Sequence, residues 1–140
     1  MLRKNICDYL EDIERITNRK ITNKQKQLVI DYIRNNQFFK VKISTEKMRK
    51  KEFNKNRTKI REEWERETGQ KWPQYEMDVY DRNGKVVRKK GQYYDAHHIV
   101  EMRFGGLDIW YNLFPASYPD EHQNGIHRKG SIASKIFGEN

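Results

Sequence analysis

Apolar residues recur at helical spacing early in this chain and at alternating spacing later, and this change of period constrains the fold most strongly. Helical spacing relates one early set of apolar residues: Leu2, Ile6, Tyr9, Leu10, Ile13 and Ile16. A second segment begins where Thr22 and Gln25 fit a capping box and ends at Asn35-Asn36. We therefore expect two N-terminal helices whose apolar stripes pack together.

Residues 40–61 form a strongly basic run, with ten Lys or Arg against Glu46 and Glu52. The chain then turns acidic from Glu62, and Thr68-Gly69 is a stop signal for a helix. Apolar residues are sparse across this stretch, so we expect a third helix that is exposed along much of its length. Its basic half either follows a phosphate backbone or is an ordinary solvated face, and the pattern favours neither reading.

The period changes after Trp72-Pro73. Met77, Val79 and Val86 alternate around Asn83-Gly84, which is typical of a β-hairpin with a tight turn. Helices followed by strands indicate an α+β fold. We expect a helical, basic segment over residues 1–72 that packs or contacts DNA or an inhibitor, and a second segment over residues 73–140.

The charge of the chain points to an anionic partner. It has 29 Lys and Arg against 20 Asp and Glu, a formal net charge of +9. Such an excess attracts polyanions, first nucleic acid and next an acidic protein or an anionic membrane surface. The single cysteine, Cys7, excludes an intrachain disulfide and a thiolate zinc cluster. Charges interrupt every apolar run near Met1, so the N-terminus is neither a signal peptide nor a membrane span.

All four histidines lie in the last third of the chain: His97, His98, His122 and His127. Imidazole is a common ligand of divalent metals, and three imidazoles with an open position form a catalytic site. On an extended segment, adjacent side chains point to opposite sides, so one member of the His97-His98 pair can face a metal while the other faces water. His122 and His127 are five residues apart, and we expect Gly125 to distort the helix between them.

The ordered pattern of these residues resembles a known family. It consists of residues 95–101 (DAHHIVE), Gly105-Gly106, residues 112–115 (NLFP), His122, and residues 126–128 (IHR). This pattern resembles the HNH/endonuclease VII superfamily, in particular the His-His variants of colicin-type DNases and of nuclease domains in bacterial polymorphic toxins. The resemblance covers roughly the last third of the chain.

The resemblance implies a role for each matching residue. His98 would be the general base that takes a proton from the attacking water. His97, His122 and His127 would hold one divalent metal ion, for which zinc, nickel, magnesium and manganese all remain open. Asn112 would hydrogen-bond to the backbone across the loop and hold the base histidine in orientation.

The resemblance also implies that residues 73–140 contain a ββα-metal motif, a β-hairpin crossed by a helix around the metal. Arg103 and Arg128 are the nearest candidates for binding the phosphate, because a guanidinium fork matches its oxygens. Asp95 and Glu121 are alternative oxygen ligands. Each lies within two residues of a histidine, so the other readings are a hydrogen-bonding role that orients a ligand and an ordinary surface charge.

These matches imply an endonuclease with little sequence specificity that prefers DNA and serves as an antibacterial toxin module. A toxin of this kind implies an acidic immunity protein as partner. It would act in the bacterial cytoplasm, or in that of a target cell after specialised secretion. Three rivals remain: an RNase, a phage or mobile-element nicking endonuclease on the same scaffold, and a non-catalytic metal-stabilised nucleic-acid-binding module. His98 separates the last rival from the others, because a purely structural metal site has no use for an extra base.

Overall fold

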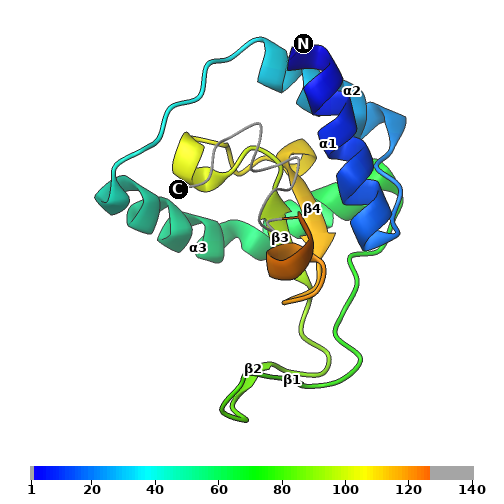
Figure 1. Ribbon diagram of the computed structural model, residues 1–140, viewed down its shortest axis with the longest axis vertical. Coiled ribbons are helices and arrows are strands. Elements are labelled where there is room, and N and C mark those ends of the chain that lie inside the picture. The colour runs from blue at the N-terminus through cyan, green and yellow to red at the C-terminus, as the bar shows by residue number, and fades with distance from the viewer. Residues whose placement is uncertain (1, 127–140) are drawn as a thin grey trace.

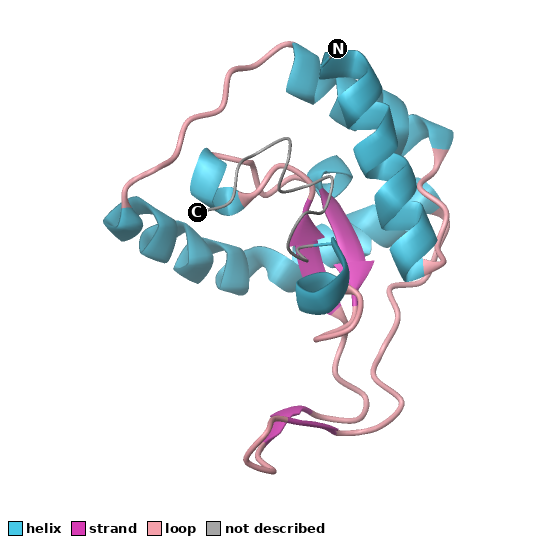
Figure 2. Ribbon diagram, viewed as in Figure 1, coloured by secondary structure: helices cyan, strands magenta, loops and turns pink. Residues whose placement is uncertain are grey.

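The computed structural model describes residues 2–126, which form a mixed α+β fold with three helices and two small antiparallel sheets. The helices and strands are α1 (Leu2–Thr17), α2 (Asn23–Arg34), α3 (Ile43–Thr68), β1 (Val79–Tyr80), β2 (Val86–Arg88), β3 (Asp95–His98) and β4 (Leu113–Ala116). Three short turns are η1 (Met102–Phe104), η2 (Trp110–Asn112) and η3 (His122–Ile126), the last a π-helix. The strands form two separate pairs (Figure 2), and the predicted order of helices before strands is confirmed. No helix of residues 2–126 has the length and apolarity needed to cross a membrane.

The two predicted N-terminal helices are confirmed as α1 and α2, which lie side by side (Figure 1). The apolar stripe of α1 is buried, as Ile6, Tyr9, Leu10 and Ile13 show. The predicted start of α2 is also correct, because the Thr22 hydroxyl accepts a hydrogen bond from the Gln25 backbone at 3.2 Å.

Gln25 does not complete the predicted capping box. Its side-chain amide donates instead to the carbonyl oxygens of Tyr111 at 3.1 Å and Leu113 at 2.8 Å. The Gln25 side chain is completely buried. Buried carbonyl oxygens must be hydrogen-bonded, whereas the backbone amides at the exposed start of a helix can bind water, so the side chain turns to the carbonyls. Gln25 therefore ties α2 to the beginning of β4.

The third helix, α3, is exposed over most of its length, as the sequence predicts, and it ends at Gly69 in the left-handed conformation. Its buried side chains are Phe53, Ile60 and Trp64. Trp64 is fully buried against Trp72, with ring centroids 5.0 Å apart, and against Phe114 of β4, at 6.0 Å. One hydrophobic core therefore includes residues from both sides of position 72.

The strands β1 and β2 form the predicted hairpin around Asn83-Gly84. Gly84 has a φ of 79°, a conformation that glycine adopts without strain. The Asp81 carboxylate accepts hydrogen bonds from the backbone amides of Asn83 and Lys85 and so closes the turn. The hairpin extends away from the helices and from the other sheet (Figure 1).

The strands β3 and β4 pair antiparallel, with His97 opposite Phe114 and His98 opposite Leu113. The loop between them turns at Gly105-Gly106. Gly105 has a φ of 87°, and a Cβ atom on Gly106 would lie 1.7 Å from the carbonyl oxygen of Val100. The loop can therefore close on itself only if glycine occupies both positions.

Candidate functional site

Adjacent histidines on β3 face opposite sides of the strand, as the sequence predicts. His97 contacts Tyr9 of α1 and His122 of η3. His98 contacts Phe53 of α3, with ring centroids 4.9 Å apart, and Asp108. The two rings therefore belong to different environments although their positions are consecutive.

The His97 ring is fully buried, and its Nε2 lies 2.7 Å from the Tyr9 hydroxyl oxygen. The same hydroxyl donates to the carbonyl oxygen of Ile99 at 2.8 Å. A hydroxyl has one hydrogen and a carbonyl can only accept, so the Nε2 of His97 is the donor, and in the neutral ring the lone pair lies on Nδ1. Burial raises the pKa of Tyr9 well above its usual value, and the charges of Glu101 and Asp12 raise it further, so the phenol stays neutral.

His122 lies beside His97, with a distance of 5.3 Å between the ring centroids. Its pKa is lowered to about 4, first because burial disfavours the charged ring. The nearby Asp95 acts in the opposite direction, whereas electrostatic interactions with His98 and Arg88 lower the pKa of His122 further. His122 is therefore a neutral imidazole at neutral pH, which is the form that coordinates metals.

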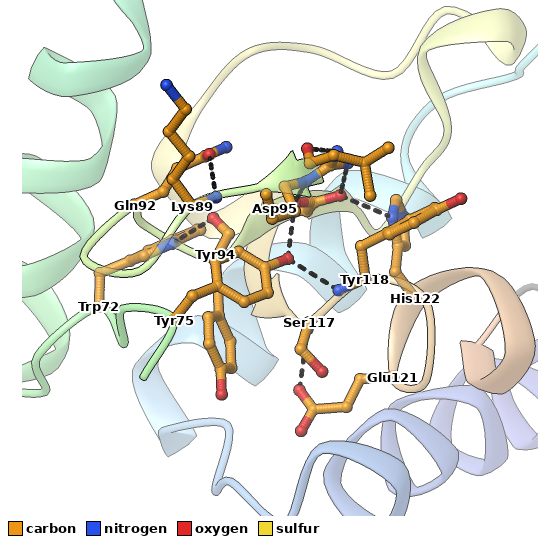
Figure 3. Close-up of polar contacts among 12 residues, drawn as sticks. Trp72, Tyr75, Lys89, Gln92, Tyr94, Asp95, Ser117, Tyr118, Glu121 and His122 are labelled. Carbon is orange, nitrogen blue, oxygen red and sulfur yellow. Dashed lines mark hydrogen bonds and ion pairs between the residues drawn. The ribbon is translucent and has the colours of Figure 1, made fainter. Parts of the chain in front are cut away.

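Asp95 is held by a network of hydrogen bonds at the start of β3 (Figure 3). Arg88 binds both of its carboxylate oxygens, Nε at 2.8 Å and Nη2 at 2.7 Å, and the Tyr75 hydroxyl donates to Oδ1 at 3.0 Å. The Tyr75 oxygen also accepts from the Tyr118 amide at 2.8 Å. Burial alone would raise the pKa of Asp95, but the hydrogen bonds and charge of Arg88 outweigh it, so the net shift is downward. This ionised carboxylate lies 4.0 Å from the Nδ1 of His122.

His98 forms a pair with a carboxylate that the sequence pattern did not single out. Its Nε2 lies 2.9 Å from Oδ1 of Asp108, and its side chain is only 10% exposed. Arg49 lies 3.5 Å from the same carboxylate oxygen and donates to the Gly106 carbonyl at 2.6 Å. Asp108 thereby fixes the orientation of the His98 ring, and α3 is linked to the loop through Arg49.

Asn112 bridges the loop between the two strands. Its side-chain oxygen accepts from the Val100 amide at 2.7 Å, and its amide nitrogen donates to the carbonyls of Val100 at 3.1 Å and Leu107 at 2.9 Å. The side chain is fully buried. Asn112 therefore makes the backbone contacts that the family resemblance implies, and two of them are to Val100, which is two residues after His98.

The other predicted site residues lie elsewhere. Arg103 is in η1, where its Nη2 lies 3.5 Å from Glu101, and it does not line the cleft beside α3. The Glu121 carboxylate accepts hydrogen bonds from Arg19 at 2.8 Å and from the Ser117 amide at 3.0 Å. His127 and Arg128 lie outside the described residues.

The described residues bring together two of the three predicted metal ligands, His97 and His122. Two imidazoles beside an ionised carboxylate are donors that a divalent first-row metal accepts, so the chemistry of the set fits. Within residues 2–126, no three His, Cys, Asp or Glu side chains are arranged to hold an ion. The third predicted ligand, His127, lies outside the described residues, so the complete set stays a prediction.

A cleft of about 690 Å³ opens between the middle of α3 and the chain from β2 to β3. Arg57 and Arg61 of α3 line one wall, and Tyr93 lines the other. Asp95 and His122 also line the cleft, so it leads to the histidine cluster.

Two curated proteins are similar to this chain over almost its whole length. It is 46% identical over 134 residues to Toxin YxiD of Bacillus subtilis, a match that covers 94% of this chain and 23% of that protein. It is 30% identical over 132 residues to the Probable deoxyribonuclease RhsB of Dickeya dadantii, covering 89% of this chain and 8% of that protein. The chain therefore spans less than a quarter of either relative. No protein-family model matches it.

Sequence reasoning missed three side chains that shape the site: Tyr9, Arg88 and Asp108. Tyr9 and His97 are 88 positions apart, and no local spacing relates them. Asp108 had a weak signal, because it is an acidic residue two positions after Gly106 and the turn folds back toward the histidine pair.

Proposed function

We propose that this chain is a metal-dependent endonuclease module of the HNH kind, which cuts DNA with little sequence specificity as part of a larger bacterial toxin. The names of the two relatives, a toxin and a probable deoxyribonuclease, support the nuclease and toxin parts. The ordered pattern from His97 to His127 supports the HNH part. The net charge of +9 supports a polyanionic substrate.

The observation that carries the proposal is that the two adjacent histidines of β3 have different partners on opposite sides of the strand. His97 lies beside His122 on one side of the strand, and His98 is paired with Asp108 on the other. A site that only bound a structural metal would gain nothing from the second arrangement. A hydrolase needs it, because the water that attacks a phosphodiester must lose a proton.

His98 is the proposed general base. Its Nε2 donates to the Asp108 carboxylate, so the lone pair is on Nδ1, which takes the proton from the attacking water. Asp108 also stabilises the imidazolium that results, because an ionised carboxylate hydrogen-bonded to the ring favours its charged form. Asn112 holds the loop that carries Asp108 against Val100, so the geometry of the pair is set before substrate binds.

His97 and His122, with His127 from the sequence pattern, are the proposed metal ligands. A divalent ion bound there would supply positive charge to the phosphate and its leaving oxygen. Tyr9 fixes the His97 ring so that Nδ1 is the donor atom, and Asp95 lies beside the His122 ring in turn. Zinc, nickel, magnesium and manganese all remain open for this donor set.

The local fold supports the ββα-metal reading. β3 and β4 form an antiparallel pair, and the turn η3 follows them and carries His122. A π-helix has hydrogen bonds from residue i to i+5, and this is also the separation of His122 and His127. The turn that carries His122 is therefore wider than an α-helix.

The name of one relative, a toxin, supports the proposed biological role. A nuclease module within a toxin acts in the cytoplasm of a target cell after delivery. The producing cell then needs a protective partner, and an acidic immunity protein fits the positive charge of this chain. Adding the immunity protein to this chain should abolish cleavage of DNA.

The decisive assay incubates the purified chain with supercoiled plasmid and, separately, with total RNA. Each divalent ion is tested in turn, and a chelator is the control. We expect nicking and linearisation of the plasmid that the chelator stops. Degradation of RNA with intact plasmid would transfer the proposal to an RNase, and binding without cleavage of either substrate would leave a non-catalytic metal-stabilised module.

A further inference from the structure

The cleft beside α3 has a wall of positive charge that the proposed chemistry does not use. Arg57 and Arg61 are four residues apart, so they project from the same face of the helix into the cleft. Arg88 also lines the cleft, but both oxygens of Asp95 already neutralise it. Among residues 2–126, the positive charge of this wall that has no carboxylate partner therefore comes from Arg57 and Arg61.

Arg61 is held in place without an anionic partner among the described residues. Its guanidinium carbon lies 3.6 Å from the centroid of the Tyr93 ring, a stacked position that fixes the plane of the fork. Its Nε is buried and has no hydrogen-bond partner within residues 2–126. A buried donor on a cation costs free energy when it is left unpaired, so this position favours an anionic ligand that accepts from it.

Arg57 extends the same site by one helical turn. It is exposed, its guanidinium carbon lies 5.6 Å from the Phe53 ring centroid, and it has no carboxylate partner in the part of the chain that the structure describes. Three other basic residues of α3 do have one: Arg49 pairs with Asp108, Lys50 with Glu46 and Lys55 with Glu52. Arg57 and Arg61, by contrast, face the cleft with their charges uncompensated.

The cleft suits the sugar-phosphate backbone of a nucleic-acid strand. Guanidinium forks match phosphate oxygens, and the Tyr93 face that could stack on a base is covered by Arg61. Contacts of this kind position a strand without reading its sequence. Because His122 and Asp95 line the same cleft, a strand bound there continues to the histidine cluster.

We infer that Arg57 and Arg61 form a backbone-binding site that holds the substrate strand next to the cleaved phosphate. This inference rests on the proposed nuclease function and adds to it the residues that position the substrate. They replace Arg103 as the principal phosphate contacts among the described residues.

The test measures binding of a fluorescein-labelled single-stranded oligodeoxynucleotide by anisotropy at several salt concentrations. Every protein carries His98→Ala, so that the probe stays intact. The double variant Arg57→Gln/Arg61→Gln is compared with Lys55→Gln/Lys59→Gln, which removes two charges at the same spacing from positions of α3 that do not line the cleft. Both variants have the same net charge.

We expect the arginine variant to bind about 10- to 100-fold more weakly, since a charge-assisted hydrogen bond contributes about tenfold or more. The slope of the logarithm of the binding constant against the logarithm of the salt concentration should become less steep by about 0.7 for each phosphate that the variant no longer binds. The lysine variant should bind less than about threefold more weakly, through the general field. Arg57→Gln alone, at an exposed position that cannot disturb the core, should show part of the effect.

Equal decreases in affinity for the two double variants would overturn the inference and leave the nuclease proposal intact, provided that the protein with native His98 still cuts plasmid. Failure of that protein to bind or cut nucleic acid would overturn both. Circular dichroism of each variant separates weaker binding from unfolding, and Arg57→Gln with unchanged affinity would contradict the inference even if the double variant unfolds.

Discussion

Replacing Asn112 by alanine removes the clamp across the β3–β4 loop, and the structure allows its cost to be worked out. The side chain makes three hydrogen bonds, to the Val100 amide, the Val100 carbonyl and the Leu107 carbonyl. At about 1 kcal/mol net for each bond, their loss costs about 3 kcal/mol. The Val100 amide is then left buried without its acceptor, which raises the total to about 3–5 kcal/mol.

This cost is measured as the change in unfolding free energy in urea, followed by tryptophan fluorescence. A loss of about 3 kcal/mol corresponds to a fall of about 6 °C or more in melting temperature for a chain of this size. Asn112→Asp should recover little of it, because the second carboxylate oxygen faces the carbonyls of Val100 and Leu107. At a temperature where Asn112→Ala remains folded, plasmid cleavage should still fall, since the loop no longer holds Asp108 against His98.

Asn56→Ala is the matched control. Asn56 is exposed on α3 and makes one hydrogen bond to the Glu52 carbonyl, so its replacement should change stability by less than about 0.5 kcal/mol. If Asn112→Ala were as stable as Asn56→Ala, the Asn112 clamp would not be holding the loop, and the predicted cost would be refuted.

Three further substitutions test other contacts of the same fold. Gly106→Ala should unfold the loop or cost more than about 3 kcal/mol, because its Cβ would lie 1.7 Å from the Val100 oxygen, whereas Gly84→Ala in open space should cost about 1 kcal/mol; thermal melts distinguish them. Tyr9→Phe removes the partner of His97 and should cost about 1–3 kcal/mol and weaken metal binding, measured by calorimetry. Arg88→Gln should cost about 3 kcal/mol in urea, since it leaves the Asp95 charge half-buried without its partner; an unchanged midpoint would contradict this.

Local sequence signals predicted the parts of the fold that depend on local physics. Gly69 ends α3 because only glycine adopts the left-handed conformation there at little cost, and Asn83-Gly84 makes the hairpin turn for the same reason. The opposite orientation of His97 and His98 follows from the period of an extended strand, which needs no knowledge of the surroundings.

The contacts that complete the site depend on tertiary structure and were not predictable from spacing. Gln25 is a good helix-capping residue by pattern, but its side chain turns to carbonyls 86 and 88 positions away. The bond between Tyr9 and His97 likewise joins the first helix to the third strand. A single sequence contains the residue types for such bonds but not the packing of α1 and α2 against the β3–β4 pair that brings them together.

Among the site residues, too, some were predictable from the sequence pattern and others depend on the tertiary structure. The pattern of histidines predicts that His97, His122 and His127 act together; the rings of His97 and His122 lie side by side, and their role as metal ligands stays a prediction. Arg103 is near the histidines in sequence, whereas the cleft is lined by Arg57 and Arg61, which lie some forty positions earlier on α3. Phosphate-binding residues are especially hard to predict, because any surface arginine has the right chemistry and only the fold decides which ones face the substrate.

The proposed mechanism depends above all on His98 being the general base. The rest of the protein should then fold and bind metal without the His98 side chain. A time course of plasmid nicking compares the parent protein with His98→Ala, together with the metal content of both proteins and their urea unfolding. We predict that His98→Ala abolishes nicking, keeps the metal content of the parent, and loses no more than about 1–2 kcal/mol of stability with the hydrogen bond to Asp108. If His98→Ala nicks plasmid as fast as the parent, His98 is not the base and the mechanism is wrong.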